Sequence, residues 1–177
     1  PKGYHLEYGY STMGYEIAGG LGVKLAEPER DVYVMVGDAS YLMMNTEIVT
    51  MVQERMKVII VLLDNHGYAS IGGLSKSLGS DGFGTKYRYR TESAQLDGEV
   101  LPIDFAANVR SLGATVIRAS NRDEIADAVN KAKLHRDGPI CIVVETDRSQ
   151  RVGGYEPWWD VAVAEVSTNP DVQAARE

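Results

Sequence analysis

Four apolar runs of strand length divide the chain, and amphipathic stretches of helix length separate them. The runs begin at Val32, Val58, Ala114 and Ile140 and read VYVMV, VIIVLL, ATVIRA and ICIVVE. Runs this short and this apolar are typical of parallel strands covered by helices on both faces. The alternation therefore predicts an α/β fold of three layers, α/β/α, with a mainly parallel sheet in the middle.

Capping residues indicate where the helices begin and end. Asn45 is expected to cap a helix with apolar residues at helical spacing, and Asp104 to cap the helix FAANVRSL, which Gly113 closes. Asn121 and Glu124 form a start similar to a capping box for EIADAVNKAKLHR. The stretch STMGYEIAGGLGVKLA also reads as a helix, and its glycines indicate close approach to another backbone.

The segment 67–100 loses this periodicity and is rich in Gly, Ser, Tyr and Arg. A connection of this length in a compact domain is usually a lid or a binding loop, so we expect a mobile active-site loop. Its cationic residues Lys86, Arg88 and Arg90 would close over a polyhydroxylated substrate or meet an acidic product, or they would form a solvated surface.

Length and composition limit the classes of protein to consider. The 177 residues fit one domain, 1–177, and the start without Met suggests a piece of a longer multidomain enzyme. The net charge of -7 argues against nucleic-acid binding, and no apolar run is long enough to span a membrane. The single cysteine, Cys141, falls in an apolar run, which fits a reduced core residue in the cytoplasm.

Polar residues follow two of the expected strands at their carboxyl ends. The first strand leads into Gly37 and Asp38, and the second leads into Asp64, Asn65 and His66. If the two strands are neighbours in the sheet, Asp38 and Asn65 meet at one edge. Carboxylate and amide oxygens suit Mg²⁺, although Asp and Asn also follow strands as simple turn residues.

Two other phosphate-binding motifs are absent. A dinucleotide fingerprint fails because GLGVKL has Leu25 and GFGTKY has Tyr87 where the third glycine belongs. No phosphate loop of the G-x-x-x-x-G-K-[ST] type occurs. At the first strand end, Gly37 would let the backbone approach a ligand, and Ser40 would offer a hydroxyl and an amide to a phosphate.

These residues resemble the diphosphate-binding domain of the thiamin diphosphate-dependent enzymes. The family signature runs from an apolar-Gly pair through a proline and a strand to Gly-Asp, and here LG at Leu21, then Pro28 and GDAS from Gly37 fill those places. A second metal residue, an asparagine, follows nearly thirty positions later in the family, and Asn65 occupies that place. Many members have two asparagines there, whereas this chain has Asp64 before Asn65.

The resemblance implies thiamin diphosphate and Mg²⁺ as cofactors. Mg²⁺ would be held by the Asp38 carboxylate, the Asn65 side chain and the Gly67 carbonyl. The Met13 side chain would wedge under the bent cofactor, and the Ser11 carbonyl would accept a bond from its aminopyrimidine. Met13 as ordinary core filler is the alternative. The implied cofactor-binding residues are Ser11, Met13, Gly37, Asp38, Ala39, Ser40, Asn65 and Gly67.

Within this family, the runs YHLEYGYSTMGYEIAGGLGVKLA, VGDASYLMMNTEIV and LLDNHGYASIGGL are most similar to the trihydroxycyclohexanedione hydrolases of myo-inositol catabolism. Those enzymes hydrolyse a carbon–carbon bond of a cyclic 1,2-diketone to give 5-deoxyglucuronate. The acid–base residues are unknown, and His5, Glu7, His66 and Tyr68 are candidates near the two cofactor-facing segments. Simple hydrogen bonds to backbone are the alternative role for His5 and His66.

The family's activating glutamate belongs to a separate pyrimidine-binding domain, normally contributed by another subunit. The resemblance therefore implies a homodimer or homotetramer, and a chain that is inactive alone. Alternatives are an enzyme similar to acetohydroxyacid synthase or glyoxylate carboligase, a non-catalytic cofactor-binding or assembly module, and a plain structural domain.

Overall fold

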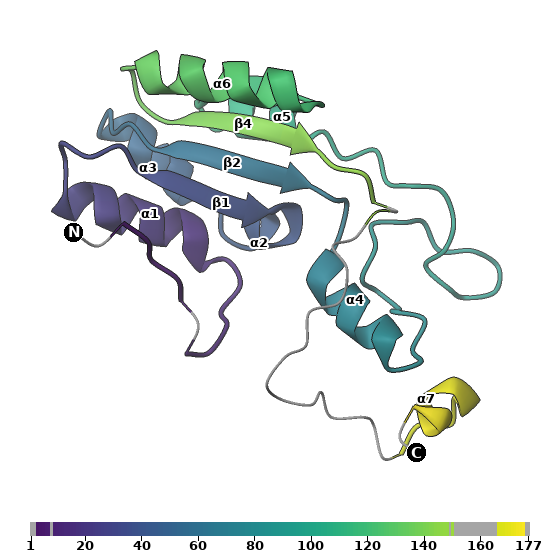
Figure 1. Cartoon of the computed structure of the whole chain (residues 1–177). Helices are drawn as coiled ribbons and strands as arrows, with labels where there is room; N and C mark the ends of the chain where they lie inside the picture. Colours follow the sequence, from purple (N-terminus) through teal and green to yellow (C-terminus); the bar gives the residue numbers. More distant parts are fainter. Residues whose placement is uncertain (1–2, 8, 149, 151–165, 176–177) are drawn as a thin grey trace. The chain divides into compact units, whose positions relative to one another are not determined.

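The computed structural model describes residues 3–7, 9–148, 150 and 166–175 (Figure 1). The chain divides into two compact units, which we call the sheet unit and the loop unit. The sheet unit comprises Pro1–Asp64 and Asp104–Thr146, and the loop unit comprises Asn65–Ile103 and Asp147–Glu177. The organisation of the chain as a single domain stays a prediction.

The sheet unit contains four strands that are all parallel, as the alternating pattern predicts. They lie in the order β1-β2-β4-β3 (Figure 1). Their bounds are Tyr33–Gly37 for β1, Ile59–Asp64 for β2, Thr115–Ala119 for β3 and Ile140–Glu145 for β4. Each expected run is therefore a strand, within one residue of its expected start.

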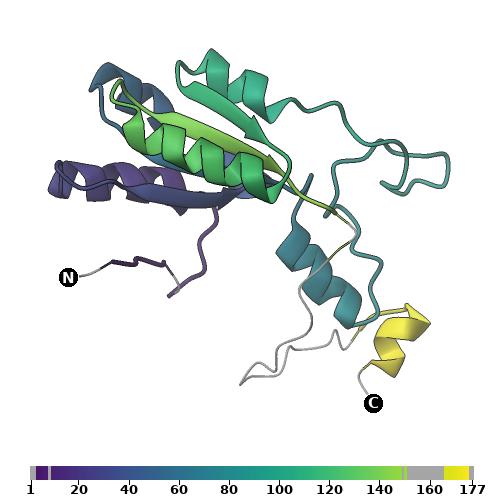
Figure 2. The same ribbon diagram turned by 45° about the horizontal axis from the view of Figure 1, so that its top comes forward.

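Helices cover both faces of this sheet, which confirms the three-layer α/β/α fold. Helix α6 (Arg122–Leu134) lies above the sheet in Figure 1 and in front of it in Figure 2, whereas α1 (Tyr15–Ala26) lies on the opposite side. On the side covered by α6, Ala128 and Ala132 pack against Ile59 and Ile142 in one core cluster. Helices α2 (Asp38–Met43), α3 (Glu47–Gln53) and α5 (Phe105–Ser111) complete the sheet unit.

The sequence pattern predicts strands buried on both faces, but one face of β1 is exposed. Tyr33 is 43% and Met35 68% exposed, while Val34 and Val36 are buried. The register pairs Tyr33 with Ile59, so the exposed residues continue the face that α6 covers at β3 and β4. Strand β1 is the edge strand, and among the described residues no helix covers this part of its surface.

A close contact between α1 and β1 explains one of the helix glycines. A Cβ atom at Gly20 would lie 2.2 Å from Cγ2 of Val34, so only glycine lets the helix approach the strand this closely. The neighbour is a side chain, whereas the sequence suggested a backbone. A Cβ at Gly22 would meet nothing within 4 Å, so close packing does not account for that glycine.

Two of the three predicted helix caps are confirmed. The Asp104 carboxylate accepts a hydrogen bond from the Ala107 amide at 2.9 Å, and Asn121 accepts one from the Glu124 amide at 3.0 Å. The cap at Asn45 is wrong, because α3 begins after Thr46 and no side chain caps it. The Asn45 side chain instead donates to Asn108 of α5 at 3.4 Å.

The loop unit contains a helix that the sequence did not indicate. Helix α4 (Ala69–Ser77) occupies the first part of the segment expected to be an irregular loop, and α7 (Pro170–Ala174) lies near the end of the chain. Asn169 caps α7 and its amide also donates to the Gly79 carbonyl at 3.4 Å. Among the described residues, no helix combines the length and the apolar character needed to cross a bilayer.

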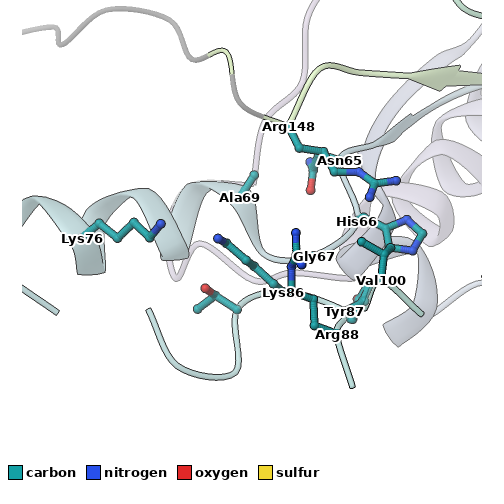
Figure 3. Close-up of a pocket in the computed structure, with 11 residues that line it drawn as sticks. Asn65, His66, Gly67, Ala69, Lys76, Lys86, Tyr87, Arg88, Val100 and Arg148 are labelled. Carbon is teal, nitrogen blue, oxygen red and sulfur yellow. The ribbon is translucent and has the colours of Figure 1, made fainter. Parts of the chain in front are cut away.

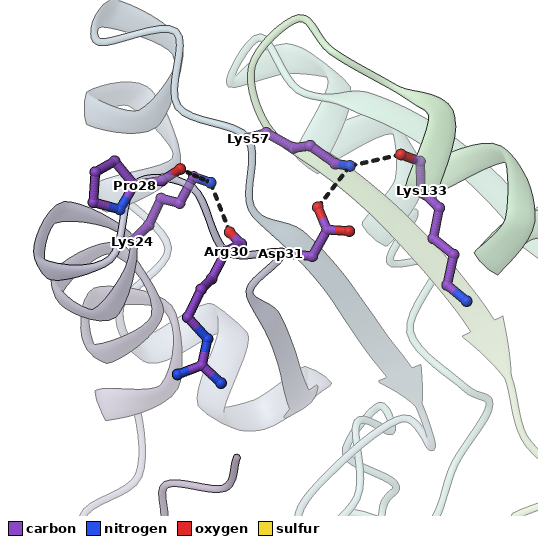
Figure 4. A network of polar contacts seen from close by, with 6 residues as sticks. All are labelled: Lys24, Pro28, Arg30, Asp31, Lys57 and Lys133. Carbon is purple, nitrogen blue, oxygen red and sulfur yellow. Dashed lines mark hydrogen bonds and ion pairs between the residues drawn. The ribbon is translucent and has the colours of Figure 1, made fainter. Parts of the chain in front are cut away.

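A lysine network closes the edge of the sheet unit at which the strands begin (Figure 4). The buried Lys57 ammonium donates to Asp31 at 2.9 Å and to the Lys133 carbonyl at the end of α6 at 2.8 Å. The ammonium of Lys24 donates to the carbonyls of Pro28 and Arg30 at 2.6 and 2.7 Å. Hydrogen bonding to Lys57 holds the pKa of Asp31 below its ordinary value. These contacts anchor the connection between α1 and β1.

The Gly20 contact predicts opposite effects for two alanine substitutions in one helix. Gly20→Ala forces α1 away from Val34 and lowers the free energy of unfolding by about 1–3 kcal/mol. Gly22→Ala has open space and raises it by up to about 1 kcal/mol through helix propensity. Urea denaturation of both variants checks this, and equal effects would contradict the close packing.

Candidate functional site

The ends of β1 and β2 lie side by side in the sheet unit. The two strands pair in parallel, with Gly37 opposite Leu63. The segments that follow the two strands therefore leave the sheet at the same edge. Asp38 follows Gly37 directly, and Asn65 is bonded to Asp64, the last residue of β2. The neighbouring strands that the sequence required for a shared metal site are therefore confirmed.

Asp38 begins α2 with no irregular turn between strand and helix. Its side chain is fully buried at 0% exposure, and Ala39 and Ser40 in the same turn are also buried. Gly37 occupies the N-cap position in extended conformation, with φ -77° and ψ 156°. The four residues Gly37 to Ser40 thus form a strand-to-helix junction that places a buried aspartate at the carboxyl edge of the sheet.

Asn65 presents an orphaned oxygen. Its Oδ1 atom is buried and has no hydrogen-bond partner among the described residues. Leaving a buried amide oxygen unsatisfied costs about 1–3 kcal/mol, and such atoms are rare in native structures unless they have a function. An oxygen of this kind is suited to bind a cation. Among the described residues, no group of three or more His, Cys, Asp or Glu side chains forms an alternative metal site.

The turn after Asn65 is held by the segment around Thr85. The Tyr68 amide donates to the Thr85 carbonyl at 2.9 Å, and the Tyr87 amide donates to the His66 carbonyl at 3.1 Å. Gly67 has a φ of 150°, and a Cβ at this position would lie 2.4 Å from the Thr85 carbonyl oxygen. The turn therefore requires a glycine at position 67, two residues after Asn65.

His66 is buried and has a structural partner in the loop unit. It adopts a positive φ of 58°, its Nε2 lies 2.7 Å from the Leu101 carbonyl oxygen, and its ring packs edge-on against Tyr87. Tyr68 precedes α4 and also packs edge-on against Tyr87. Both residues stay candidates for proton transfer, and both help to hold the turn in place.

The segment before α1 carries the remaining candidates. Glu7 accepts hydrogen bonds from the amides of Thr12 and Tyr10, at 2.7 and 3.1 Å, which hold its pKa below the ordinary value. The carboxylate is therefore ionised at neutral pH and serves as an acceptor. His5 bonds the Tyr15 hydroxyl at 2.7 Å.

The two residues with implied cofactor contacts lie in the same segment. Ser11 is exposed and has a positive φ of 52°, and Met13 is half-buried next to Gly14, the N-cap of α1. Their contacts with a cofactor stay predictions. Cys141 is a buried free thiol, as predicted, and burial raises its pKa to about 12, so it is inert.

A pocket of about 550 Å³ lies within the loop unit (Figure 3). Asn65, His66 and Gly67 form part of its wall, and Lys86 and Arg88, two of the three cations expected near a ligand, line it as well. The third, Arg90, does not line it. Its guanidinium donates to the Ala94 carbonyl and lies 5.8 Å from the centre of the Phe83 ring.

Two lining residues were missed in the sequence. Lys76 reaches the pocket from the last turn of α4, and Arg148 reaches it from the segment that follows β4. The position of Lys76 depends on a helix that the glycine- and serine-rich sequence does not indicate. Arg148 is far from the segment 67–100 in sequence, and only the folded chain brings it there.

Comparisons with known proteins agree on one protein family. The family model for the C-terminal TPP binding domain of thiamine pyrophosphate enzymes matches residues 1–144. The chain is 45% identical over 178 aligned residues to a 3D-(3,5/4)-trihydroxycyclohexane-1,2-dione hydrolase of Bacillus cereus (strain AH820), covering 100% of the chain and 28% of that protein. A relative of the same name from Bacillus thuringiensis (strain Al Hakam) is 44% identical, with the same coverage of both chains.

A solved structure shares the fold. It is the thiamine diphosphate-dependent 4-hydroxybenzoylformate decarboxylase of Rhodococcus jostii RHA1, with a TM-score of 0.61 and 26% identity. The similarity covers 77% of this chain and 24% of the decarboxylase chain. The chain thus spans about a quarter of the length of each of these proteins.

The crowded glycine in the turn predicts a specific loss of stability. Gly67→Ala places a methyl group against the Thr85 carbonyl and lowers the free energy of unfolding by about 1–3 kcal/mol. Gly84→Ala is the matched control, because Gly84 also has a positive φ but a Cβ there meets nothing within 4 Å. It loses about 1 kcal/mol or less. Equal losses in chemical denaturation would show that backbone conformation alone matters.

Proposed function

Because the chain belongs to the family of thiamine pyrophosphate enzymes, through their C-terminal cofactor-binding domain, we propose that it supplies the diphosphate-binding half of a trihydroxycyclohexanedione hydrolase active site. The observation that carries this proposal is the 45% identity along the whole chain to relatives of that name. The proposed activity belongs to the complete polypeptide. This chain covers only 28% of the length of the relative from Bacillus cereus.

In the proposed site, Asp38, Asn65 and the Gly67 carbonyl hold Mg²⁺. Three features of the structure fit this set of ligands. The Asp38 carboxylate is fully buried, the Asn65 Oδ1 atom is buried without a partner, and the Gly67 turn excludes any side chain. A carboxylate, an amide oxygen and a backbone carbonyl are hard oxygen ligands, which Mg²⁺ prefers, and substrate or cofactor phosphates complete such sites. The metal would give the orphaned amide oxygen its partner.

Thiamin diphosphate, when bound, would supply carbanion chemistry toward a substrate carbonyl, and the residues of this chain would orient it and control protons and water. Ala39 and Ser40 lie beside the metal carboxylate, where the Ser40 hydroxyl and amide bind the diphosphate. The Ser11 carbonyl and the Met13 side chain position the aminopyrimidine end. His5, Glu7, His66 and Tyr68 stay candidates for the proton transfers, with Glu7 restricted to accepting protons by its lowered pKa.

The net reaction of the proposal balances with one water molecule. The bond between the two carbonyl carbons of the ring breaks, and the oxygen of water ends on one of them as a carboxylic acid. The other carbon takes a proton and becomes an aldehyde, so the ring opens to 5-deoxyglucuronate. At neutral pH the new acid ionises, and the reaction converts an uncharged ring into an anion.

The proposal includes partners and a compartment. The glutamate that activates the cofactor lies on a pyrimidine-binding domain of another subunit, so the complete enzyme is a homodimer or homotetramer. The substrate is a small cyclic polyol diketone, and neither nucleic acid nor membrane is a partner. A buried free thiol at Cys141 fits the reducing cytoplasm.

The rival substrates are 2-oxo acids. The Rhodococcus relative is named as a decarboxylase of 4-hydroxybenzoylformate, which shows that one domain fold serves different reactions in this family. An acetohydroxyacid synthase or a glyoxylate carboligase would use pyruvate or glyoxylate. Product analysis of the complete enzyme with pyruvate, glyoxylate and the cyclic diketone separates these activities from the proposed hydrolysis.

Removal of the orphaned oxygen predicts opposite effects on folding and on binding. Asn65→Leu keeps a similar shape without the unsatisfied oxygen, so the metal-free protein keeps its free energy of unfolding or gains about 1 kcal/mol. Mg²⁺-dependent binding of thiamin diphosphate falls at least about 100-fold, because a metal ligand is lost. Urea denaturation and calorimetry on the complete polypeptide measure the two effects.

Two further variants complete this experiment. Asp38→Ala also abolishes Mg²⁺-dependent binding, whereas Asp127→Asn, an exposed carboxylate on α6, leaves it unchanged. Unchanged cofactor affinity in both Asp38→Ala and Asn65→Leu would refute the metal site. It would leave a non-catalytic module as the better account.

The isolated chain is predicted to be inactive. The purified chain of residues 1–177 binds Mg²⁺ and diphosphate weakly and opens no cyclic diketone, because the activating glutamate is elsewhere. Release of acid is followed in a pH-stat, with the complete polypeptide as the positive control. Turnover by the 177-residue chain would contradict the need for a second domain.

A further inference from the structure

Helix α2 begins at the proposed metal ligand and is too short to fix its own position. It spans Asp38–Met43, which is 6 residues, and among the described residues no side chain caps its start. At its end the Met44 amide donates to the Ser40 carbonyl at 3.4 Å, which is long for a backbone hydrogen bond. Helices this short depend on tertiary packing for their stability. The position of Asp38 therefore depends on the contacts that anchor α2.

Tyr41 is the main anchor of this helix. It lies three residues after Asp38, is 0% exposed and heads the described residues that are fully buried when these are ordered by volume. Its ring packs edge-on against Phe105 of α5, with 6.2 Å between the ring centres. Its hydroxyl donates a hydrogen bond to Oδ1 of Asn108, also on α5, at 2.6 Å. One side chain thus joins α2 to α5 both by packing and by a hydrogen bond.

Helix α5 is itself held in place by the sheet. The Asp104 carboxylate caps its first turn and also bonds Arg118 of β3. Phe105 and Val109 are buried, and α5 packs against β3 and β4. All of these residues, and α2 with them, belong to the sheet unit. The hydrogen bond from Tyr41 therefore ends on a support that the sheet fixes.

The hydroxyl of Tyr41 is not needed to fill space. Phenylalanine would occupy the same volume without burying a polar atom, and a buried hydroxyl is unfavourable unless it is hydrogen-bonded. Burial raises the pKa of Tyr41 above its ordinary value, so the hydroxyl keeps its proton and acts as a donor at neutral pH. The acceptor, Asn108, is exposed at the surface of α5. The bond thus adds to the apolar packing a fixed direction between the two helices.

We infer that Tyr41 is a positioning residue for the metal site, and that its hydrogen bond to Asn108 keeps Asp38 where Mg²⁺ requires an oxygen ligand. The inference rests on the proposed function, since it takes Asp38 as a metal ligand. Mg²⁺ demands nearly octahedral geometry with oxygens at about 2.0–2.1 Å, so a small displacement of one ligand weakens it. Ca²⁺ accepts flexible geometry at about 2.3–2.6 Å and tolerates such a displacement better.

The test compares the two ions in the complete polypeptide. Calorimetry measures thiamin diphosphate binding as Mg²⁺ or Ca²⁺ is added, at a temperature at which circular dichroism shows each variant to be folded. In Tyr41→Phe, which removes only the hydroxyl, the Mg²⁺ concentration for half-saturation rises about tenfold. The Ca²⁺ concentration rises by less than about threefold, because Ca²⁺ is less sensitive to ligand geometry. A variant that merely lost folded protein would lose both ions equally.

Asn108→Ala removes the other half of the same hydrogen bond. Asn108 is exposed and Ala is a good helix former, so this variant is expected to fold. Its Mg²⁺ requirement also rises about tenfold, and the double variant stays within about twofold of either single variant, because both changes remove one interaction. If Tyr41→Phe did not fold, Asn108→Ala alone would decide the inference.

Tyr33→Phe is the matched control. It removes a tyrosine hydroxyl from the strand that leads to Asp38, but Tyr33 is 43% exposed and is the first residue of β1, at the end away from the proposed metal. The Mg²⁺ requirement of this variant stays within about twofold of that of the unmodified protein.

Three results would overturn the inference. They are a Mg²⁺ requirement that stays within about twofold in both single variants, equal losses with Mg²⁺ and Ca²⁺, and losses that multiply in the double variant. Failure of the proposed function is a different result. It shows as an unmodified polypeptide that binds no thiamin diphosphate with Mg²⁺, or as normal binding by Asp38→Ala, and either outcome removes the metal site together with the role of Tyr41.

Discussion

The parallel pairing of β1 with β2 is the constraint on which the rest of the structure depends. Because Gly37 lies opposite Leu63, the residues that follow the two strands leave the sheet at one edge. Burial of Val34, Val36, Ile60 and Leu62 holds this register, since a shift by one residue would turn these side chains to the opposite face. The chemistry assigned to Asp38 and Asn65 therefore depends on an apolar core that contains neither of them.

The two compact units of the chain are built differently. The sheet unit has a packed apolar core under α6, a glycine contact between α1 and β1, and a lysine network at the edge where the strands begin. The loop unit has a short helix and irregular segments joined by backbone hydrogen bonds around Gly67. Binding residues commonly lie on connecting segments of this kind. His66 has a positive φ of 58°, which is unfavourable for a residue other than glycine, at the turn where a ligand site is proposed, as functional sites often show.

The sequence predicted the sheet well because strand burial depends on local apolar runs. Asp104 and Asn121 were also readable, since each bonds an amide only three residues away. The prediction of a helix cap at Asn45 was wrong, because its side chain donates a hydrogen bond to Asn108, a residue distant in sequence. Helix α4 was missed because its glycines and serines have weak helix propensity.

Two features of the candidate site lay beyond the sequence for the same physical reason. The lack of a partner at the Asn65 oxygen is a property of the surrounding packing, and no residue pattern reports it. Arg148 lines the same pocket as Lys76 and Lys86 only because the fold brings distant parts of the sequence together. What the sequence did provide was the chemical identity of the ligands, because Asp38 and Asn65 stand directly at strand ends.

The most direct measurement replaces Mg²⁺ with Mn²⁺ and locates the ion by anomalous scattering in crystals of the complete polypeptide with thiamin diphosphate. One Mn²⁺ peak is expected, in contact with the Asp38 carboxylate, the Asn65 amide oxygen and the Gly67 carbonyl. A peak away from these three residues, or an Asn65 oxygen still unbound beside a bound cofactor, would contradict it.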